Sequence, residues 1–240
     1  MRRLLVGLTV SGIVAILFFV GLPNGAGSPV AGTTSVVFAS HSVGYSIPEC
    51  TGFLHEGPYV NIVATGACEL EAGSTVSGFV KVKPGASFTA SGSEINGQFT
   101  GKEADFVTLT NMDMQRSISV DGTSNQVFIA RSSVGQDLKV RDSGDVIIFR
   151  NTVGKDLWGN QNDDLKIGGN TVGKNLVAAR NDDVIISNNS VGKDLKVGQN
   201  EDVVITDNIV VKTLDCRQND EISGSGNTAA ELKGQCEFFF

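Results

Sequence analysis

The sequence predicts an all-β protein, a single-stranded right-handed parallel β-helix (β-solenoid) with coils of about 19 residues and disulfide-capped ends. Three observations predict this fold: a short repeat, apolar columns with strand alternation, and a cysteine pair near each end of the repeat. The repeat is clearest where NTVGKDL at 151–157 returns as NTVGKNL at 170–176 and NSVGKDL at 189–195. A short fixed period is typical of stacked structural units. Right-handedness is expected from the usual chirality of parallel crossover connections.

The chain begins with a segment that precedes the predicted fold. A short basic start, MRR, is followed by an apolar run from Leu4 to Leu22 and then by small residues. This order predicts an export signal peptide over residues 1–26, with an uncleaved N-terminal membrane anchor as the alternative because the run is long enough to span a bilayer. Residues 27–48 are rich in Gly, Ser, Thr, Pro and Val and are expected to form a flexible leader. The candidate cleavage positions are near Ala26, near Ala31 and after Ala39.

The β-helix domain is expected over residues 49–240, and its interior is predicted by apolar columns. Two of these columns lie two residues apart in every coil, which is the spacing of side chains on one face of a strand. Gly, Asn and Asp between the apolar positions are turn formers, so each coil is expected to hold about three short strands. We expect an N-terminal cap over 49–75, repeat coils over 76–222 and a C-terminal cap over 223–240. The two columns are Phe88, Val107, Val127, Val146, Leu165, Val184, Val203 and Ile222, and Ala90, Leu109, Ile129, Ile148, Ile167, Ile186, Ile205 and Gly224.

Four cysteines flank the repeat: Cys50, Cys68, Cys216 and Cys236. Four cysteines allow three pairings. The spacings of 18 and 20 residues are each close to one coil, and stacked strands lie about 4.8 Å apart, within the range of a disulfide. We therefore predict Cys50–Cys68 and Cys216–Cys236, placed where an open solenoid end needs a cap. Export to an oxidising compartment agrees with these bonds.

An asparagine recurs at one position of successive coils and predicts a structural turn. Asn tolerates left-handed backbone geometry, and stacked Asn side chains hydrogen-bond along the axis as a ladder. The predicted ladder consists of Asn151, Asn170, Asn189, Asn208 and Asn227.

Two acidic columns lie side by side at another corner of the coil. Neighbouring carboxylates about 5 Å apart repel each other by roughly 1 kcal/mol in water, and calcium would offset this repulsion. The other interpretation is a solvated turn without metal, and the Gly-Gly-x-Gly-x-Asp signature of calcium-binding repeats is absent. We expect no cofactor, with calcium as the alternative. The candidate ligands are Asp145, Asp163, Asp164, Asp182, Asp183, Glu201 and Asp202, next to Asn162, Asn181 and Asn200.

Enzymatic activity is not expected from the residue types present. A polysaccharide lyase or hydrolase needs converging acids or a base in a groove walled by long loops, and these coils are uniform apart from a one-residue insertion around 120–126. The two histidines, His41 and His55, assemble no nucleophile–base set.

Trp158 is expected to point outward, where a lone Trp can stack on a sugar. A net charge of −7 without a basic block makes nucleic acid a poor candidate partner.

Both ends of the chain resemble a known group of proteins. Residues 50–99 contain a Cys-Thr-Gly segment, a second Cys and a Pro-Gly corner, and residues 214–236 contain LDC, GNT and GQC. This pattern resembles secreted bacterial, especially actinobacterial-type, right-handed parallel β-helix repeat proteins of unknown function. The chain departs from it at 229–231, where Ala-Ala-Glu replaces the usual Val-Gly-Gly. The resemblance implies an exported β-helix and implies no activity.

Together these observations predict an exported, non-enzymatic structural or binding module of the cell envelope, secreted or at the cell surface. A glycan or a cell-surface protein on one flat face is the expected kind of partner, and membrane contact is expected only if the N-terminal segment is uncleaved. The alternatives are a carbohydrate-active β-helix enzyme and a calcium-binding solenoid.

Overall fold

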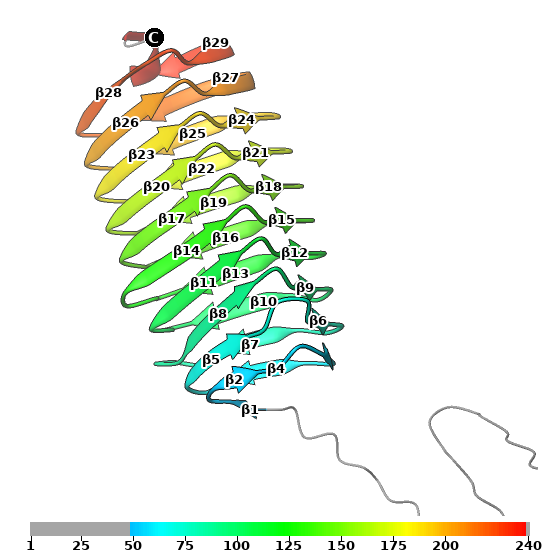
Figure 1. The fold of residues 1–240 in the computed structure, drawn as a ribbon. Helices are drawn as coiled ribbons and strands as arrows, with labels where there is room; N and C mark the ends of the chain where they lie inside the picture. Colours follow the sequence, from blue (N-terminus) through cyan, green and yellow to red (C-terminus); the bar gives the residue numbers. More distant parts are fainter. Residues whose placement is uncertain (1–48, 239–240) are drawn as a thin grey trace, which may run out of the picture. The chain divides into compact units, whose positions relative to one another are not determined.

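The computed structural model describes residues 49–238, which form a parallel β-solenoid (Figure 1). Its strands belong to one sheet of ten strands and one sheet of 19 strands. Corresponding strands of successive coils pair in parallel and in register, with partners 19 residues apart in most coils. This confirms the predicted all-β solenoid. The predicted signal segment 1–26 and leader 27–48 lie outside the described residues. Within 49–238, no helix is long and apolar enough to cross a membrane.

Each coil contains three strands, and the longest of them forms the ten-stranded sheet. The strands of this sheet are β2 (Phe53–Leu54), β5 (Ala67–Leu70), β8 (Ser87–Ser91), β11 (Phe106–Thr110), β14 (Gln126–Ala130), β17 (Asp145–Phe149), β20 (Asp164–Gly168), β23 (Asp183–Ser187), β26 (Asp202–Thr206) and β28 (Glu221–Ser225). The second strand of each coil has two residues, and these strands are β3 (Pro58–Tyr59), β6 (Thr75–Val76), β9 (Glu94–Ile95), β12 (Asp113–Met114), β15 (Ser133–Val134), β18 (Thr152–Val153), β21 (Thr171–Val172) and β24 (Ser190–Val191).

The third strand of each coil lies in the same 19-stranded sheet as the second. These strands are β1 (Glu49–Cys50), β4 (Ile62–Ala64), β7 (Val80–Val82), β10 (Phe99–Lys102), β13 (Ile118–Asp121), β16 (Leu138–Arg141), β19 (Leu157–Asn160), β22 (Leu176–Ala179) and β25 (Leu195–Gly198). At the C-terminal end the second and third strands merge into β27 (Ile209–Arg217) and then β29 (Thr228–Gly234), which is followed by the 3-10 helix η1 (Gln235–Phe238).

The core is a set of stacked aliphatic columns along the axis. Alternate residues of each strand point inward, so Val146 pairs with Leu165 and Ile148 with Ile167 in successive coils. These four side chains are at most 1% exposed. Because like residues stack on like residues, each coil buries its apolar face against its neighbours and not against a separate layer.

Two corners of each coil turn through a residue with a positive φ angle. At one corner this residue is Arg150 (φ 55°) or Asn188 (φ 57°), and at the other it is Gln161 (φ 58°) or Gln199 (φ 60°). We expected the ladder asparagines themselves to adopt the left-handed conformation. They do not, because the residue before each Asn makes the turn, and the Asn that follows thereby points into the core.

The first ladder, from Asn151 to Asn227, lies inside the corner that contains Arg150 and Asn188. Its buried side-chain amides find hydrogen-bond partners within the protein, as Asn170 shows. Asn170 donates its backbone N–H to Asn189 Oδ1 at 2.9 Å, and its Nδ2 donates to the same oxygen at 3.0 Å. The second hydrogen of Nδ2 goes to the backbone carbonyl of Ile148 at 3.0 Å. Asn170 is 1% exposed, so each of these bonds replaces one that the side chain would make with water.

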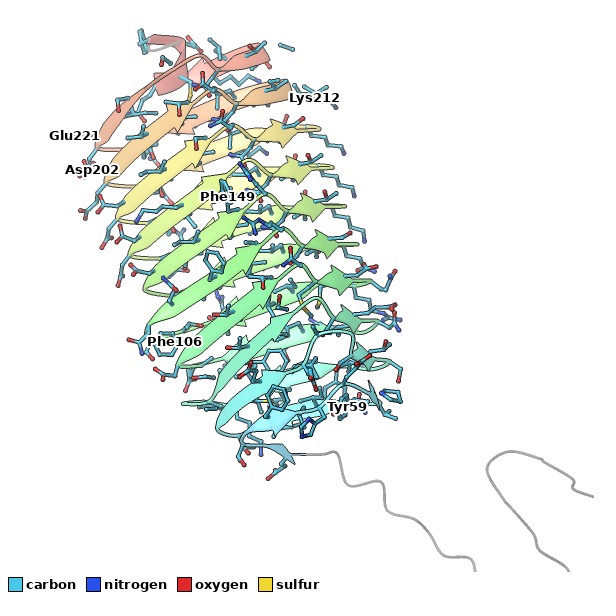
Figure 2. The ribbon with its side chains drawn as sticks, viewed as in Figure 1. Tyr59, Phe106, Phe149, Asp202, Lys212 and Glu221 are labelled. Carbon is cyan, nitrogen blue, oxygen red and sulfur yellow. A yellow bond between two sulfur atoms is a disulfide. The ribbon has the colours of Figure 1, made fainter. Side chains whose placement is uncertain are left out.

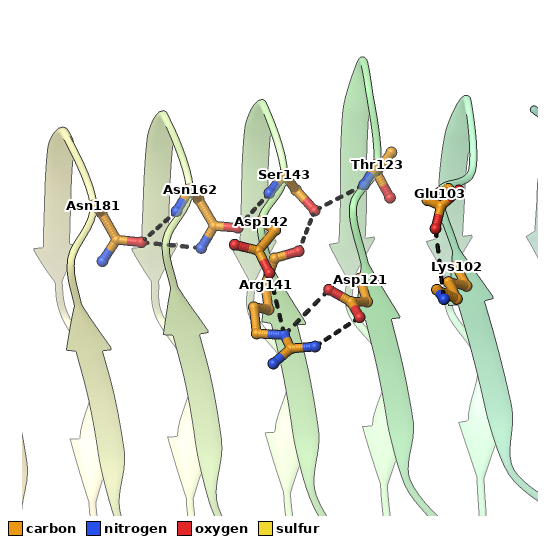
Figure 3. A network of polar contacts seen from close by, with 9 residues as sticks. All are labelled: Lys102, Glu103, Asp121, Thr123, Arg141, Asp142, Ser143, Asn162 and Asn181. Atoms are coloured by element: carbon orange, nitrogen blue, oxygen red, sulfur yellow. Dashed lines mark hydrogen bonds and ion pairs between the residues drawn. The ribbon is translucent and has the colours of Figure 1, made fainter. Parts of the chain in front are cut away.

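A second ladder, which the sequence interpretation placed at the acidic corner, runs through the other turn. Asn162, Asn181 and Asn200 are each at most 2% exposed, and each accepts from the preceding coil through Oδ1, as in the pair Asn162–Asn181 (Figure 3). At its C-terminal end Asn219 donates its backbone N–H to Gln235 Oε1 at 2.9 Å, and Gln235 Nε2 donates to the Asn219 carbonyl at 2.7 Å. The glutamine of η1 therefore ends the ladder.

The structure joins Cys50 to Cys68 and Cys216 to Cys236, with Cα–Cα distances of 5.4 and 5.2 Å. The geometric reason given above, that each pair lies on stacked strands, is wrong. Cys50 stacks on Ala64, whereas Cys68 lies in the other sheet, so the first bond crosses between the two sheets. Cys236 lies in η1, which brings it back to Cys216 over the end of the array.

Strands at both ends of the array pair with the neighbouring coils. Residues 49–75 form strands that continue the coils, as β3 pairs with β6 and β4 with β7. At the other end β28 and β29 also continue the coils, and only η1 departs from the repeat. Phe238 is 82% exposed, so it does not cover the end of the core.

Replacing Asn189 with Ala should destabilise the protein because it leaves the buried backbone N–H of Asn170 without an acceptor. An unsatisfied buried donor costs about 1–3 kcal/mol, which corresponds to a fall in Tm of several degrees in a chain of this size. Thermal unfolding followed by circular dichroism checks this. Ser190→Ala, at an exposed neighbouring position, is the matched control, and an equal shift in both variants would contradict the ladder's role.

Removing the C-terminal disulfide with the double variant Cys216→Ala/Cys236→Ala should open the array from that end. Closing a loop of this length stabilises a fold by about 3 kcal/mol. Because each coil contacts mainly its neighbours, amide hydrogen exchange should accelerate first in β28 and β29. The matched variant Cys50→Ala/Cys68→Ala should instead expose β1 to β5. Uniform acceleration along the whole array in either variant would contradict this expectation.

Candidate functional site

One outer face of the solenoid, formed by the third strands, combines an aromatic side chain with charged and amide groups. Strand alternation puts two outward positions on each of these strands. The first outward column contains Ser119, Lys139, Trp158 and Val177, and the second contains Asp121, Arg141, Asn160 and Ala179.

A shallow pocket of about 220 Å³ lies on this face across β13, β16 and β19. Arg141 and Asn160 form its second column, and the smaller Ala179 follows in the next coil. Its lining consists of Ser119, Val120, Asp121, Lys139, Val140, Arg141, Trp158 and Asn160.

Trp158 is half-buried on this face and packs against the preceding coil. The Lys139 ammonium lies 5.8 Å from the centroid of the indole ring, within the range of a cation–π interaction. Inside the coil the next residue is Gly159, where an added Cβ would lie 2.6 Å from Leu165 Cδ2. The larger Leu165 side chain therefore fills the interior at the coil that carries the Trp.

Two polar atoms of this site are buried without a hydrogen-bond partner among the described residues: Trp158 Nε1 and Asn160 Oδ1. One is a donor and the other an acceptor. An unsatisfied buried polar atom costs free energy, so a group that accepts from the indole N–H and donates to the amide oxygen would stabilise both. Because the two atoms are enclosed by their neighbours, a ligand reaches them only after one of these side chains turns.

A bidentate ion pair closes one side of the pocket (Figure 3). Arg141 Nε lies 3.1 Å from Asp121 Oδ1 and Arg141 Nη2 lies 2.7 Å from Asp121 Oδ2. A further contact of 3.3 Å joins Arg141 Nε to Asp142 Oδ2. The hydrogen bonds from Arg141 lower the pKa of Asp121 below its ordinary value, and the same pair raises the pKa of Arg141. Both groups therefore stay charged at neutral pH.

This arrangement suits recognition of a polyhydroxylated ligand. An indole ring offers an apolar face for the C–H side of a sugar ring, and a hydroxyl group is both donor and acceptor, as the two unsatisfied atoms require. Fixed charged groups at the pocket edge can bind further hydroxyls without changing protonation.

The predicted acidic columns are brought together by the fold, but their asparagines are not available. Asp164 pairs with Asp183, and Asp183 with Asp202, on adjacent strands of the ten-stranded sheet. Asp163, Asp182 and Glu201 are exposed in the turns before these strands, and Asp145 heads the column. The neighbouring Asn162, Asn181 and Asn200 point inward, where their side chains hydrogen-bond within the second ladder. No group of three or more His, Cys, Asp or Glu side chains within 49–238 is arranged to hold a metal, and calcium binding stays a prediction.

Of the residues that line the pocket, the sequence analysis singled out only Trp158. It did not identify the charged and amide groups of the second outward column, Asp121, Arg141 and Asn160. The signal was present two residues further along each third strand, because strand alternation returns that position to the same face.

The chain is a parallel β-solenoid that carries a shallow pocket lined by aromatic, charged and amide side chains. Comparison of the chain with protein families, with curated proteins and with solved structures gives no match.

The Asp121–Arg141 pair should contribute to stability only above acidic pH. Because the folded pKa of Asp121 lies below its unfolded value of about 3.9, its contribution is present above that value and is lost as the pH falls through the folded pKa. The two side chains are 31% and 55% exposed, so solvent screens the pair and its contribution to stability is small. Asp121→Asn should lower Tm by up to a few degrees at pH 7 and should leave it unchanged near the acid limit. Melting curves across the acidic range check this, with the exposed Asp163→Asn as control. A deficit in Asp121→Asn that persists at the lowest pH would contradict it.

Proposed function

We propose that the protein is an exported, non-enzymatic module of the cell surface or extracellular space that binds a glycan at the Trp158 pocket. The observation that carries the proposal is the pair of unsatisfied atoms, Trp158 Nε1 and Asn160 Oδ1, beside an indole ring on an otherwise regular scaffold. A sugar hydroxyl group can accept from the indole N–H or donate to the amide oxygen, and a sugar ring can stack on the indole face.

Export is supported by the two disulfides, which suggest an oxidising compartment outside the cytoplasm. The N-terminal segment 1–26 is proposed as the signal that takes the chain there. A rod of stacked coils then presents the pocket on a regular backbone, so that ligand binding requires only a side chain of the pocket to turn.

Binding without catalysis is favoured by the chemistry of the pocket. Glycoside hydrolysis usually requires two carboxyl groups, one of them protonated near neutral pH. The pocket lining contains a single carboxylate, Asp121, and Arg141 lowers its pKa, which is the wrong direction for a general acid. His55, the only histidine within 49–238, is 87% exposed beside Glu71 on an outer turn of the first coils.

Trp158 is the only tryptophan of the chain, so its fluorescence reports directly on the proposed site. Titration with neutral oligosaccharides, namely cellohexaose, chitohexaose and xylohexaose, should change the emission maximum with at least one of them. A pocket with one aromatic platform predicts a roughly millimolar Kd. Asn160→Ala should weaken this binding by about fivefold, since one hydrogen bond to a neutral group is worth about 1 kcal/mol.

Lys196→Ala is the matched control, because Lys196 lies in the same outward column as Trp158, two coils away. Ligand-observed saturation-transfer NMR extends the comparison to Trp158→Ala, which lacks the tryptophan fluorescence that the titration follows. The glycan proposal fails if no oligosaccharide changes the emission, or if Trp158→Ala binds as well as the unchanged protein.

A further inference from the structure

Two charged edges run along the solenoid at different turns of the coil. The basic edge lies in the turn between the second and third strands, and the acidic edge lies at the start of the long strands. Figure 2 shows Lys212 at one edge of the rod, and Asp202 and Glu221 at the other. The basic edge consists of Lys155, Lys174, Lys193 and Lys212, and the acidic edge consists of Asp145, Asp164, Asp183, Asp202 and Glu221.

No side chain of either edge forms an ion pair within the described part of the chain, although Asp156 and Asp194 directly follow Lys155 and Lys193. The ion pairs found in residues 49–238 involve other side chains throughout. All four lysines are exposed, and all the acidic residues are exposed or half-buried. Like charges one coil apart repel each other along both edges, so each edge would be stabilised by a surface of opposite charge.

The two edges have the same axial spacing. Asp164 and Asp183 are direct partners on adjacent strands. On the basic edge, the backbone N–H of Lys174 donates to the Lys155 carbonyl at 2.9 Å, and that of Lys193 to the Lys174 carbonyl at 2.9 Å. Both edges therefore advance by one coil per charge. If two parallel copies place one lysine against one carboxylate, the other pairs along the edges come into register as well.

Exposed apolar side chains accompany both edges at the same level. Val204, two residues after Asp202, is 39% exposed, and Ile185 in the coil before is 42% exposed. Beside Lys212, Ile209 and Val211 are 60% and 59% exposed. A copy placed with its basic edge against the acidic edge of another would cover both sets together.

We propose that the occupant of the acidic edge is the basic edge of a second copy of this chain, aligned parallel and in register. Because such a contact joins two different surfaces, each copy can bind a further copy on either side. The result is an open row of copies, or a closed ring if the rotation between neighbouring copies brings the last copy against the first. Exposed ion pairs are individually weak, and specificity arises from their repetition at one spacing. The net charge of −7 opposes association in every orientation, so only a contact that pairs opposite charges offsets this repulsion. This proposal uses no residue of the Trp158 pocket and stands independently of the proposed function.

Sedimentation equilibrium of the oxidised protein at low and high salt tests the proposal. At low salt the average molecular mass should rise with protein concentration. Raising the ionic strength well above its physiological value should weaken association by about tenfold or more, because salt screens exposed charges. A protein that stays monomeric at every concentration and salt would overturn the proposal, and so would association that salt does not weaken.

Charge reversal identifies the edges. A basic-edge variant with Lys155, Lys174, Lys193 and Lys212 changed to Glu should stay monomeric, and so should an acidic-edge variant with Asp145, Asp164, Asp183 and Asp202 changed to Lys. An equimolar mixture of the two should associate again. The proposal is wrong if the basic-edge variant associates as the unchanged protein does, or if the mixture of folded variants stays monomeric.

A matched control separates edge contacts from net charge. Changing Lys81, Lys83, Lys102 and Lys196 to Glu alters the net charge by the same amount as the basic-edge variant and leaves both edges intact. This control should retain salt-sensitive association, and its loss would attribute the effect to net charge alone. Circular dichroism verifies folding, and if the acidic-edge reversal does not fold, Asp→Asn at the same four positions should still abolish association.

Discussion

The structure depends on the pairing between a left-handed corner residue and the buried asparagine that follows it. The corner turns the chain sharply enough for a 19-residue coil to close, and the turn would otherwise leave buried backbone donors without partners. The asparagine ladder supplies those partners along the axis. A non-glycine residue with positive φ, such as Arg150 or Gln199, costs about 1–2 kcal/mol, and from Asn151 onwards the ladder bonds offset this cost. In the earlier coils the corner residue is followed by other residue types, such as Met112 after Asn111.

Because both corners are fixed in this way, the outward positions of each strand fall into straight columns. A column is a surface on which each coil contributes one side chain at one spacing. The Trp158 pocket arises where three successive coils differ in these positions, with a carboxylate, a guanidinium and an amide in one column. The charged edges arise from the opposite situation, where successive coils repeat the same charge. Outward residues that differ between successive coils form a local site, and outward residues that repeat from coil to coil form an extended surface.

The sequence predicted the class of fold, the coil length, the inward columns and both cysteine pairs, since periodicity and alternation depend only on local spacing. It predicted less at the corners. Asn151 and Asn162 make the same kind of ladder hydrogen bond. Only Asn151 was interpreted as part of a ladder, because the acidic residues that follow Asn162 made it resemble a ligand set. The path of the Cys50–Cys68 bond between two sheets was not predictable from a spacing close to one coil. Nor was the pocket, since its residues come from three coils and no single motif contains them.

The termination of the second ladder by Gln235 bears on how such a chain changes its length. The glutamine offers Asn219 the same carbonyl oxygen that an asparagine of a further coil would offer, so the array ends wherever this substitute is placed. Duplication or loss of one repeat unit within 151–208 would leave the first coils, the last coil and their disulfides unaltered. Folding is similarly one-dimensional, because partners are about one coil apart along most of the chain and structure can propagate from any nucleus. The terminal coils then determine how many units the array contains, while the units between them remain interchangeable.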